Sequence, residues 1–195
     1  TALDSITSGA TDNVAIGSAA GTALTTGIRN VLIGYLAGDA LTDADENIAI
    51  GKSALSLDTL GSRTTAIGKS ALSNQNFTSA TNSYNVALGY EAGKAVTTGI
   101  NNTLIGSTAG DALTDADANV AIGQEALSTD TLGSQSVAIG ASALEAQNFT
   151  SATNALNTAV GTAAGASVSQ GIQNVLIGGL AGDNITTGTG NICIG

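Results

Sequence analysis

The sequence lacks several residue types with which ordinary proteins build a core. Its 195 residues include no Pro, Trp, Met or His, and only three Tyr and two Phe. With so few large rings, whatever the chain buries must be thin. The missing His, with no nucleophile beside a base and no phosphate loop followed by Lys, predicts that the protein is not an enzyme.

Cysteine and positive charge are also scarce. Cys193 is the single cysteine, which excludes an intrachain disulfide framework and a cysteine-based zinc cluster. Five Lys and Arg stand against fifteen Asp and Glu, and the net charge of −10 disfavours nucleic acid and anionic lipid as partners. No apolar run reaches the roughly 18 residues of a membrane span, so we expect no membrane insertion.

Small and aliphatic residues are what the chain has in abundance. It contains 26 Gly and is 43% hydrophobic, enough apolar surface to offset chain entropy, so the chain should fold.

From residue 13 onward the sequence is a repeat of units such as NVAIG, NVLIG and NTAVG. The eleven units start at Asn13, Asn30, Asn47, Thr64, Asn85, Asn102, Asn119, Ser136, Asn157, Asn174 and Asn191. The spacings are 17, 17, 17 and 21 residues, which together form a longer period of 72. We expect a lead-in over residues 1–12 and one repeat domain over residues 13–195, a fragment of a longer fibre because the last unit, NICIG, stops partway.

Each place of the unit has its own constraint. The second place is always β-branched and the fourth always aliphatic, which favours a strand. The fifth place is always Gly, which indicates a turn. A unit this short cannot bury its own apolar face, but stacked units can. The prediction is an all-β fold, a parallel β-solenoid (β-roll) of about eleven coils, roughly 50 Å long.

The third place is apolar as well, with Ala in seven units, Leu in three and Cys193 in the last. A strand with no polar face must be covered on both sides, and the second cover would be another chain. The small residues at the third place are what a crowded symmetry axis would select, so we expect a homotrimer.

The opening Asn is interpreted as an internal ladder whose side-chain amides bond along the stack or cap the turns. The ladder comprises Asn13, Asn30, Asn47, Asn85, Asn102, Asn119, Asn157, Asn174 and Asn191.

The motif N-[VIT]-[AL]-[ILV]-G-x-x-A resembles the head repeats of trimeric autotransporter adhesins and the NTAIG-type repeats of bacteriophage tail fibres. The resemblance covers residues 13–195 and implies a left-handed parallel β-roll that trimerises into a rod and binds host surfaces, with strands at Asn13–Ile16 and its ten equivalents. The 17- and 21-residue units and the TTG segments look more like a phage fibre.

Two acidic segments, GDALTDADEN and GDALTDADAN, occupy the same place of the 72-residue period. Their carboxylates are candidate calcium ligands, since hard cations prefer several oxygens; the alternative is a solvated turn that blocks aggregation. The candidates are Asp39, Asp43, Asp45, Asp111, Asp115 and Asp117. Apart from calcium, no cofactor is expected.

The two 21-residue units carry the insertion QNFTSATN, which should protrude. Its aromatic residue, Phe77 or Phe149, is a candidate contact for a cell-surface receptor or glycan, or the ring folds back onto a neighbouring coil. Tyr35 and Tyr90, which follow the turn Gly, are further contact candidates. Lys52 and Lys69, at equivalent places of adjacent coils, are expected to pair with nearby carboxylates.

The sequence therefore predicts a structural and adhesive fibre segment, extracellular on a virion tail fibre or a bacterial surface. One alternative is a self-assembling extracellular filament or surface layer, built through sticky solenoid ends. Another is an ice-binding solenoid with Thr rows, although DAD and DTL segments interrupt those rows.

Overall fold

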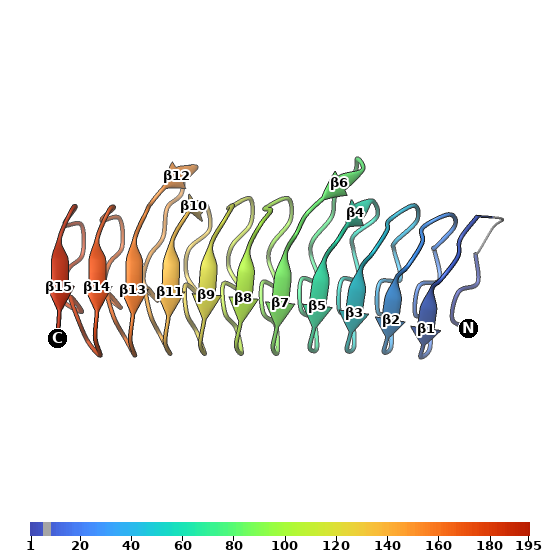
Figure 1. The fold of residues 1–195 in the computed structure, drawn as a ribbon, viewed down its shortest axis with the longest axis horizontal. Helices are drawn as coiled ribbons and strands as arrows, with labels where there is room; N and C mark the ends of the chain where they lie inside the picture. The colour runs from blue at the N-terminus through green and yellow to red at the C-terminus, as the bar shows by residue number, and fades with distance from the viewer. Residues whose placement is uncertain (6–8) are drawn as a thin grey trace.

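The computed structural model describes residues 1–5 and 9–195. Its described residues form strands and turns without a helix, and the chain is a parallel β-solenoid of eleven stacked coils. Figure 1 shows the coils side by side in chain order, with the two termini at opposite ends of the rod. Among the described residues no helix is long and apolar enough to cross a membrane. The predicted all-β solenoid is confirmed.

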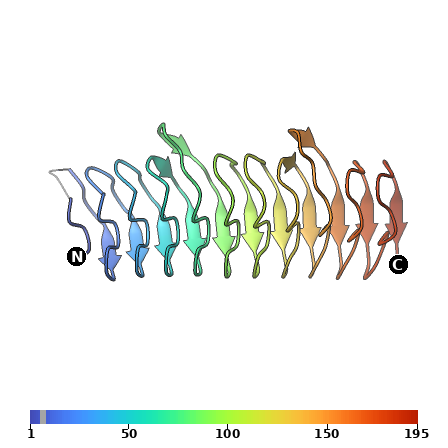
Figure 2. The same ribbon diagram turned by 180° about the vertical axis from the view of Figure 1, so that it is seen from behind.

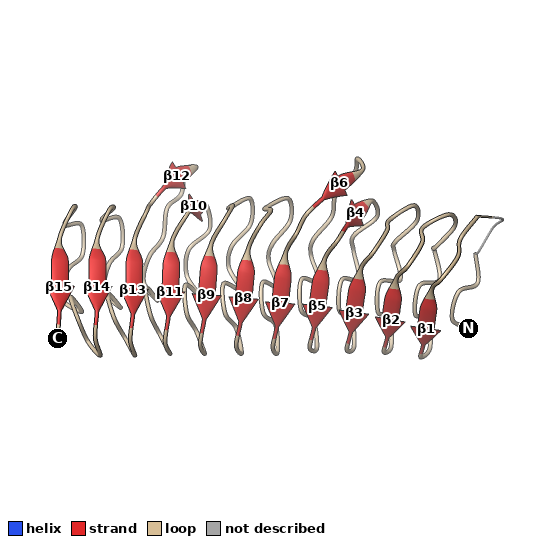
Figure 3. Cartoon of the chain, viewed as in Figure 1, coloured by secondary structure: helices blue, strands red, loops and turns tan. Residues whose placement is uncertain are grey.

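One large sheet runs the length of the rod, with one strand from each coil (Figure 3). Its strands are β1 (Val14–Ile16), β2 (Val31–Ile33), β3 (Ile48–Ile50), β5 (Thr65–Ile67), β7 (Val86–Leu88), β8 (Thr103–Ile105), β9 (Val120–Ile122), β11 (Val137–Ile139), β13 (Thr158–Val160), β14 (Val175–Ile177) and β15 (Ile192–Ile194). Two small sheets pair β4 (Gly61–Ser62) with β6 (Thr81–Asn82), and β10 (Gly133–Ser134) with β12 (Thr153–Asn154).

The strands of the large sheet pair in parallel and without any shift of register. Val14 pairs with Val31 and Ile16 with Ile33, and each later strand repeats this pairing. Equivalent places of the repeat therefore lie directly above one another, about 4.8 Å apart. Each place of the unit becomes a column of side chains along the rod.

The place that ends each strand has room only for Gly, because the backbone of the next coil lies against it. These glycines have φ values between +125° and +146°. A Cβ on any of them, from Gly17 to Gly178, would lie no more than 2.7 Å from the carbonyl oxygen of the Gly in the next coil. A side chain at this place would therefore collide with the stacked backbone.

The small third-place residues of the strands point into the coil. The central residue is completely buried in each of the nine strands that lie between β1 and β15 in the large sheet, as Ala49 and Leu104 illustrate. The second and fourth places point outward, and Ile16 is 59% exposed. The expectation that the small third place lies on a symmetry axis is wrong, because these side chains fill the thin interior of their own coil.

Within that thin interior, residue volumes compensate one another. Where the strand centre is Leu104, the turn beside it has Gly110, and a Cβ there would lie 2.7 Å from the Leu104 side chain. In the next coil the strand centre is Ala121, and the turn has the buried Leu127 instead. Leu104 also fills the space beside Gly93 of the preceding coil. Over four coils the strand-centre and turn residues are Ala and Gly, Leu and Gly, Ala and Leu, and Ala and Leu. This packing pattern repeats with the 72-residue period.

Within the described part of the chain, the two longer coils depart most clearly from the outline of the rod. Figures 1 and 2 show the segments around β6 and β12 rising above the neighbouring turns. At the other end of the chain, Ala2 and Leu3 of the lead-in pack against the core. The backbone N–H of Leu3 donates to the Ala20 carbonyl at 3.0 Å.

Candidate functional site

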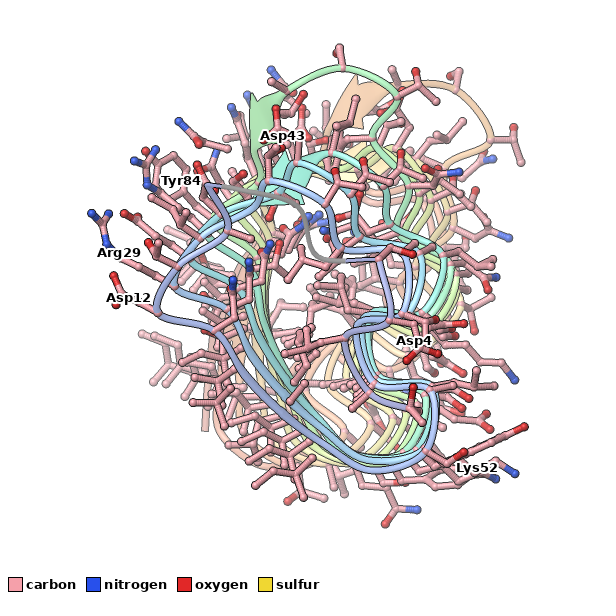
Figure 4. The ribbon with its side chains drawn as sticks, turned by 90° about the vertical axis from the view of Figure 1, so that its right-hand side faces the viewer. Asp4, Asp12, Arg29, Asp43, Lys52 and Tyr84 are labelled. Carbon is pink, nitrogen blue, oxygen red and sulfur yellow. The ribbon has the colours of Figure 1, made fainter. Side chains whose placement is uncertain are left out.

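The described surface contains no pocket. The candidate sites are therefore exposed faces of the rod, and each corresponds to a column or row of the repeat. Figure 4 looks along the rod, so that each column appears as a bundle of overlapping side chains.

The largest candidate is the outer surface of the eleven-stranded sheet, made by the second and fourth places of every strand. We call it the aliphatic face. Its members are Val, Ile and Leu with a few Thr, and they are partly or fully exposed along the whole rod. Val86 is 36% and Leu88 47% exposed in the middle of the sheet. In Figure 4 this face is the dense set of carbon side chains at the lower left.

Next to this face, inside the coil, runs the ladder of Asn side chains. The Asn47 backbone N–H donates to the Asn30 Oδ1 at 3.0 Å, and the Asn30 Nδ2 donates to the Ala44 carbonyl at 2.7 Å. Asn102 bonds in the same way to Asn119 and to Ala116. Each buried amide thus joins two coils and closes one turn, which is a structural role.

A buried polar cluster replaces the ladder where the opening residue is Thr64 or Ser136. In the first cluster the Gln75 Nε2 donates to the Asp58 Oδ2 at 2.6 Å and to the Thr64 Oγ1 at 2.9 Å. The Asp58 Oδ1 accepts from the backbone N–H groups of Gly61 and Phe77. Asp58 and Gln75 are completely buried.

The second copy of this cluster is built by Asp130, Gln147 and Ser136, with the same 2.6 Å bond from the glutamine to the aspartate. Sequence reasoning missed both clusters. Their signal was the exact 72-residue recurrence of an Asp and a Gln together with the loss of the opening Asn.

The acidic turns use their carboxylates to hold the preceding coil. The Thr26 Oγ1 donates to Asp43 at 2.5 Å, and the Ile28 N–H donates to Asp45 at 2.8 Å. Asp115 and Asp117 make the same bonds one period later. Asp39 and Asp111 lie apart from these pairs, and partial burial raises the pKa of each carboxyl.

The calcium hypothesis thus lacks a cluster of ligands. The described residues contain no group of three His, Cys, Asp or Glu side chains placed to hold a metal ion.

The protrusions keep their aromatic rings inside. Phe77 is 6% and Phe149 7% exposed, and the backbone of each bonds to the buried Asp of the same cluster. The rings therefore fold back onto the coils, and of the four aromatic receptor-contact candidates only Tyr35 and Tyr90 face solvent. The exposed part of each protrusion consists of small residues, most of them polar, among them Thr78 and Ser79.

The Thr rows also bond within the rod. The Thr25 Oγ1 donates to the Thr42 carbonyl and the Thr42 Oγ1 to the Thr59 carbonyl, both at 3.1 Å. The Thr97 and Thr114 hydroxyls repeat the pattern. Hydroxyls committed to the next coil are poorly placed to match an external lattice, which argues against ice binding.

One edge of the aliphatic face carries a charged column, formed by the residue that precedes each opening place. Glu46 lies between Arg29 and Arg63, with N–O distances of 3.0 and 2.9 Å. The hydrogen bonds from Arg63 and Arg29 lower the pKa of the exposed Glu46 carboxyl. Arg63 also lies over the Tyr84 ring, 6.0 Å from its centroid.

The opposite edge carries the column that follows the turn Gly. Here the Lys52 Nζ lies 5.9 Å from the centroid of the Tyr35 ring, and the Lys69 Nζ lies 4.9 Å from that of Tyr90. Among the described residues neither Lys forms an ion pair with a carboxylate. The expected Lys–carboxylate pairing is therefore wrong: cation–π contacts replace it, because Tyr lies at the same place of the adjacent coil.

These features define the class of protein as a parallel β-solenoid repeat protein with one long aliphatic face and two charged edges. Compared with known protein families, curated proteins and solved structures, the chain matches no family model and has no significant similarity to a curated protein or a solved structure.

Proposed function

We propose that the protein is a structural and adhesive fibre segment whose chains associate through the aliphatic face, three to a rod. The observation that carries the proposal is that face. It is three residues wide and eleven strands long, about 10 Å by 50 Å, or roughly 500 Å² of flat area. A contiguous apolar patch of this size lies toward the upper end of those on soluble monomers, where the largest patch is often functional.

A second copy of the chain is the occupant that fits best. Every strand has the same outward pair of places, a β-branched second and an aliphatic fourth, so the face repeats along the axis and lets identical chains align coil by coil. A cyclic arrangement about an axis parallel to the rod would cover the face on every chain at once. The resemblance of the repeats to trimeric fibre proteins favours three chains over two.

Such a rod would be stiff, and it would display its binding surfaces in several copies. Three chains present three copies of every exposed edge and protrusion, so weak contacts add up when they engage together. An extracellular place, on a virion tail fibre or a cell surface, follows from this role as part of the proposal.

The native mass of the purified chain, by light scattering after size exclusion, tests the proposal. We expect the mass of three chains, and a monomer for Ile122→Glu, because three carboxylates would meet at the covered face. Gln124→Glu, two residues along on the exposed edge of the same coil, should remain a trimer.

A monomeric wild-type chain at micromolar concentration would overturn the proposal. A mass of two chains would keep the face as an interface and refute the threefold arrangement. Masses that grow with concentration would favour the alternative, a filament that extends end to end.

A further inference from the structure

The five Lys and Arg side chains differ in whether a carboxylate pairs with them. Arg29 and Arg63 share Glu46, and Lys94 pairs with Glu91 at 3.1 Å. Lys52 and Lys69 are the two that make no ion pair in the described part of the chain. In a protein with fifteen acidic and five basic residues, two adjacent cations without a carboxylate partner are an exception.

These two lysines belong to one continuous column. The backbone N–H groups of the residues that follow Lys52, Lys69 and Tyr90 donate to the carbonyls of Tyr35, Lys52 and Lys69, at 2.8, 2.9 and 2.9 Å. The order along the rod is therefore Tyr, Lys, Lys, Tyr over four adjacent coils. We call this column the Tyr–Lys edge. Its ends are about 14 Å apart, three coil steps of roughly 4.8 Å.

All four side chains of the Tyr–Lys edge face solvent. Tyr35 is 51% and Tyr90 48% exposed, and both lysines are exposed. In Figure 4 Lys52 extends away from the ribbon at the lower right, apart from the aliphatic face. The edge can therefore be reached from outside even when that face is covered.

The contacts direct the two ammonium groups apart. Lys52 lies over the ring of the preceding coil and Lys69 over the ring of the following coil. Between them remains a stretch of exposed edge flanked by two positive charges. Tyr90 and Lys94 bond to the Glu91 carboxylate, and together with Lys69 they lower its pKa. The charge of Glu91 offsets part of that of Lys69.

We propose that the Tyr–Lys edge binds an acidic oligosaccharide that lies along the rod. Acidic groups of neighbouring sugars would each accept charge-assisted hydrogen bonds from one of the two ammonium groups. Flanking sugar rings would lie against the two Tyr rings, which offer an apolar face and a polar tip at little entropic cost. This proposal deepens the adhesive function proposed above and rests on it for the gain from three copies.

The chain contains its own control for this edge. The equivalent places 72 residues later hold Ser107, Gln124, Ala141 and Thr162. The backbone there bonds in the same way: the Glu125 N–H donates to the Ser107 carbonyl at 3.1 Å. The second stretch is thus the same scaffold without rings or positive charge.

Binding is tested with an oligogalacturonate, a heparin oligosaccharide and a neutral oligoglucan of equal length, by titration calorimetry on the full chain. We expect the wild type to bind an acidic probe and not the neutral one. The two acidic probes distinguish carboxylated from sulfated ligands. Affinity should fall at least about tenfold in Lys52→Gln/Lys69→Gln and in Tyr35→Ser/Tyr90→Ser, and stay unchanged in Arg29→Gln, which lies on the opposite edge of the aliphatic face.

A gain-of-function variant completes the experiment. Ser107→Tyr/Gln124→Lys/Ala141→Lys/Thr162→Tyr, placed on the Lys52→Gln/Lys69→Gln background, should restore binding. If the wild type ignores both acidic probes, or binds the neutral probe equally well, the proposal is overturned.

Wild-type affinity in both loss-of-function variants would also overturn the proposal. The Tyr and Lys contacts would then serve only to pack the surface. The native mass of each variant separates the two proposals. A trimer that does not bind refutes the Tyr–Lys edge alone, and a monomer that binds refutes the fibre assembly alone.

Discussion

At the scale of single residues, the repeat is governed by what stacked backbones allow. The fifth-place Gly combines a positive φ with direct contact to the same Gly of the next coil. Non-Gly residues do occupy left-handed conformations elsewhere in the coil, for example Leu55 at φ 53° and Glu125 at φ 57°. Their φ values lie in the αL region that L residues can reach, whereas the larger φ of the fifth-place Gly is open to Gly almost alone. Conformation and close approach of the backbones therefore both reserve the fifth place for Gly.

Gly123→Ala tests this requirement. A Cβ at residue 123 would lie 2.5 Å from the Gly140 backbone, at a φ of +138°. We expect a loss of at least about 1–3 kcal/mol from backbone strain, or roughly 2–4 °C in Tm per kcal/mol for a chain of this size. Thermal unfolding followed by circular dichroism measures it.

Gly179→Ala is the matched control, because the nearest atom to its Cβ would be 3.9 Å away. Its free energy of unfolding should change by less than about 0.5 kcal/mol. Equal Tm values for the two variants would refute the stacking argument.

At the scale of the element, each coil divides its interior between the strand centre and the facing turn. The repeated strand and turn places allowed the eleven strands of the large sheet to be predicted, because a β-branched place, an aliphatic place and a Gly recur in every unit. The pairing of Leu104 with Gly110, and of Ala121 with Leu127, could not be predicted. It depends on which residues face each other across the coil.

Leu104→Ala and Gly110→Leu test the volume exchange. Leu104→Ala alone should cost about 2–5 kcal/mol, because a buried Leu is removed. Gly110→Leu alone should destabilise by overpacking, since its Cβ would lie 2.7 Å from the Leu104 side chain. The double variant recreates the Ala–Leu pairing of the next coil, where Leu127 occupies the same turn at φ 55°.

The double variant should therefore lose less stability than the sum of the two single variants. Urea unfolding of all four proteins gives this coupling energy. Simple additivity would show that the two places do not share space.

At the scale of the whole molecule, the fold is a one-dimensional stack. Each coil contacts only its neighbours, as the unbroken chain order of the large sheet shows (Figure 1). Stability in such a stack is close to a sum of coil and interface terms. Damage to one coil should therefore remain local.

Hydrogen exchange on Leu104→Ala measures this locality. The amides of β7, β8 and β9 should lose the most protection, because these strands flank the cavity, and β2 and β14 should lose little. A uniform loss over all eleven strands would instead show that the rod unfolds as one cooperative unit.

Charge has its own distribution over the whole molecule. All five basic residues lie between Arg29 and Lys94, whereas the rest of the chain beyond Lys94 is acidic or neutral. The two charged edges therefore occupy the same few coils on either side of the aliphatic face, and of these only the Tyr–Lys edge has a net positive charge. A ligand that follows the rod would meet positive charge only there.

The sequence by itself determined the number of coils, their parallel order and the turn at each fifth place, because these follow from local propensity repeated at a constant spacing. It could not determine which face of the strand lies inside. The second, third and fourth places are nearly all apolar, so neither face is polar enough to be identified as the outer one. The tertiary structure decided that: the narrow interior accepts Ala and Leu at the third place and turns the β-branched places outward. The buried Asp58–Gln75 cluster, the inward Phe77 and the Lys52–Tyr35 contact have the same origin, since each depends on what the next coil places beside it.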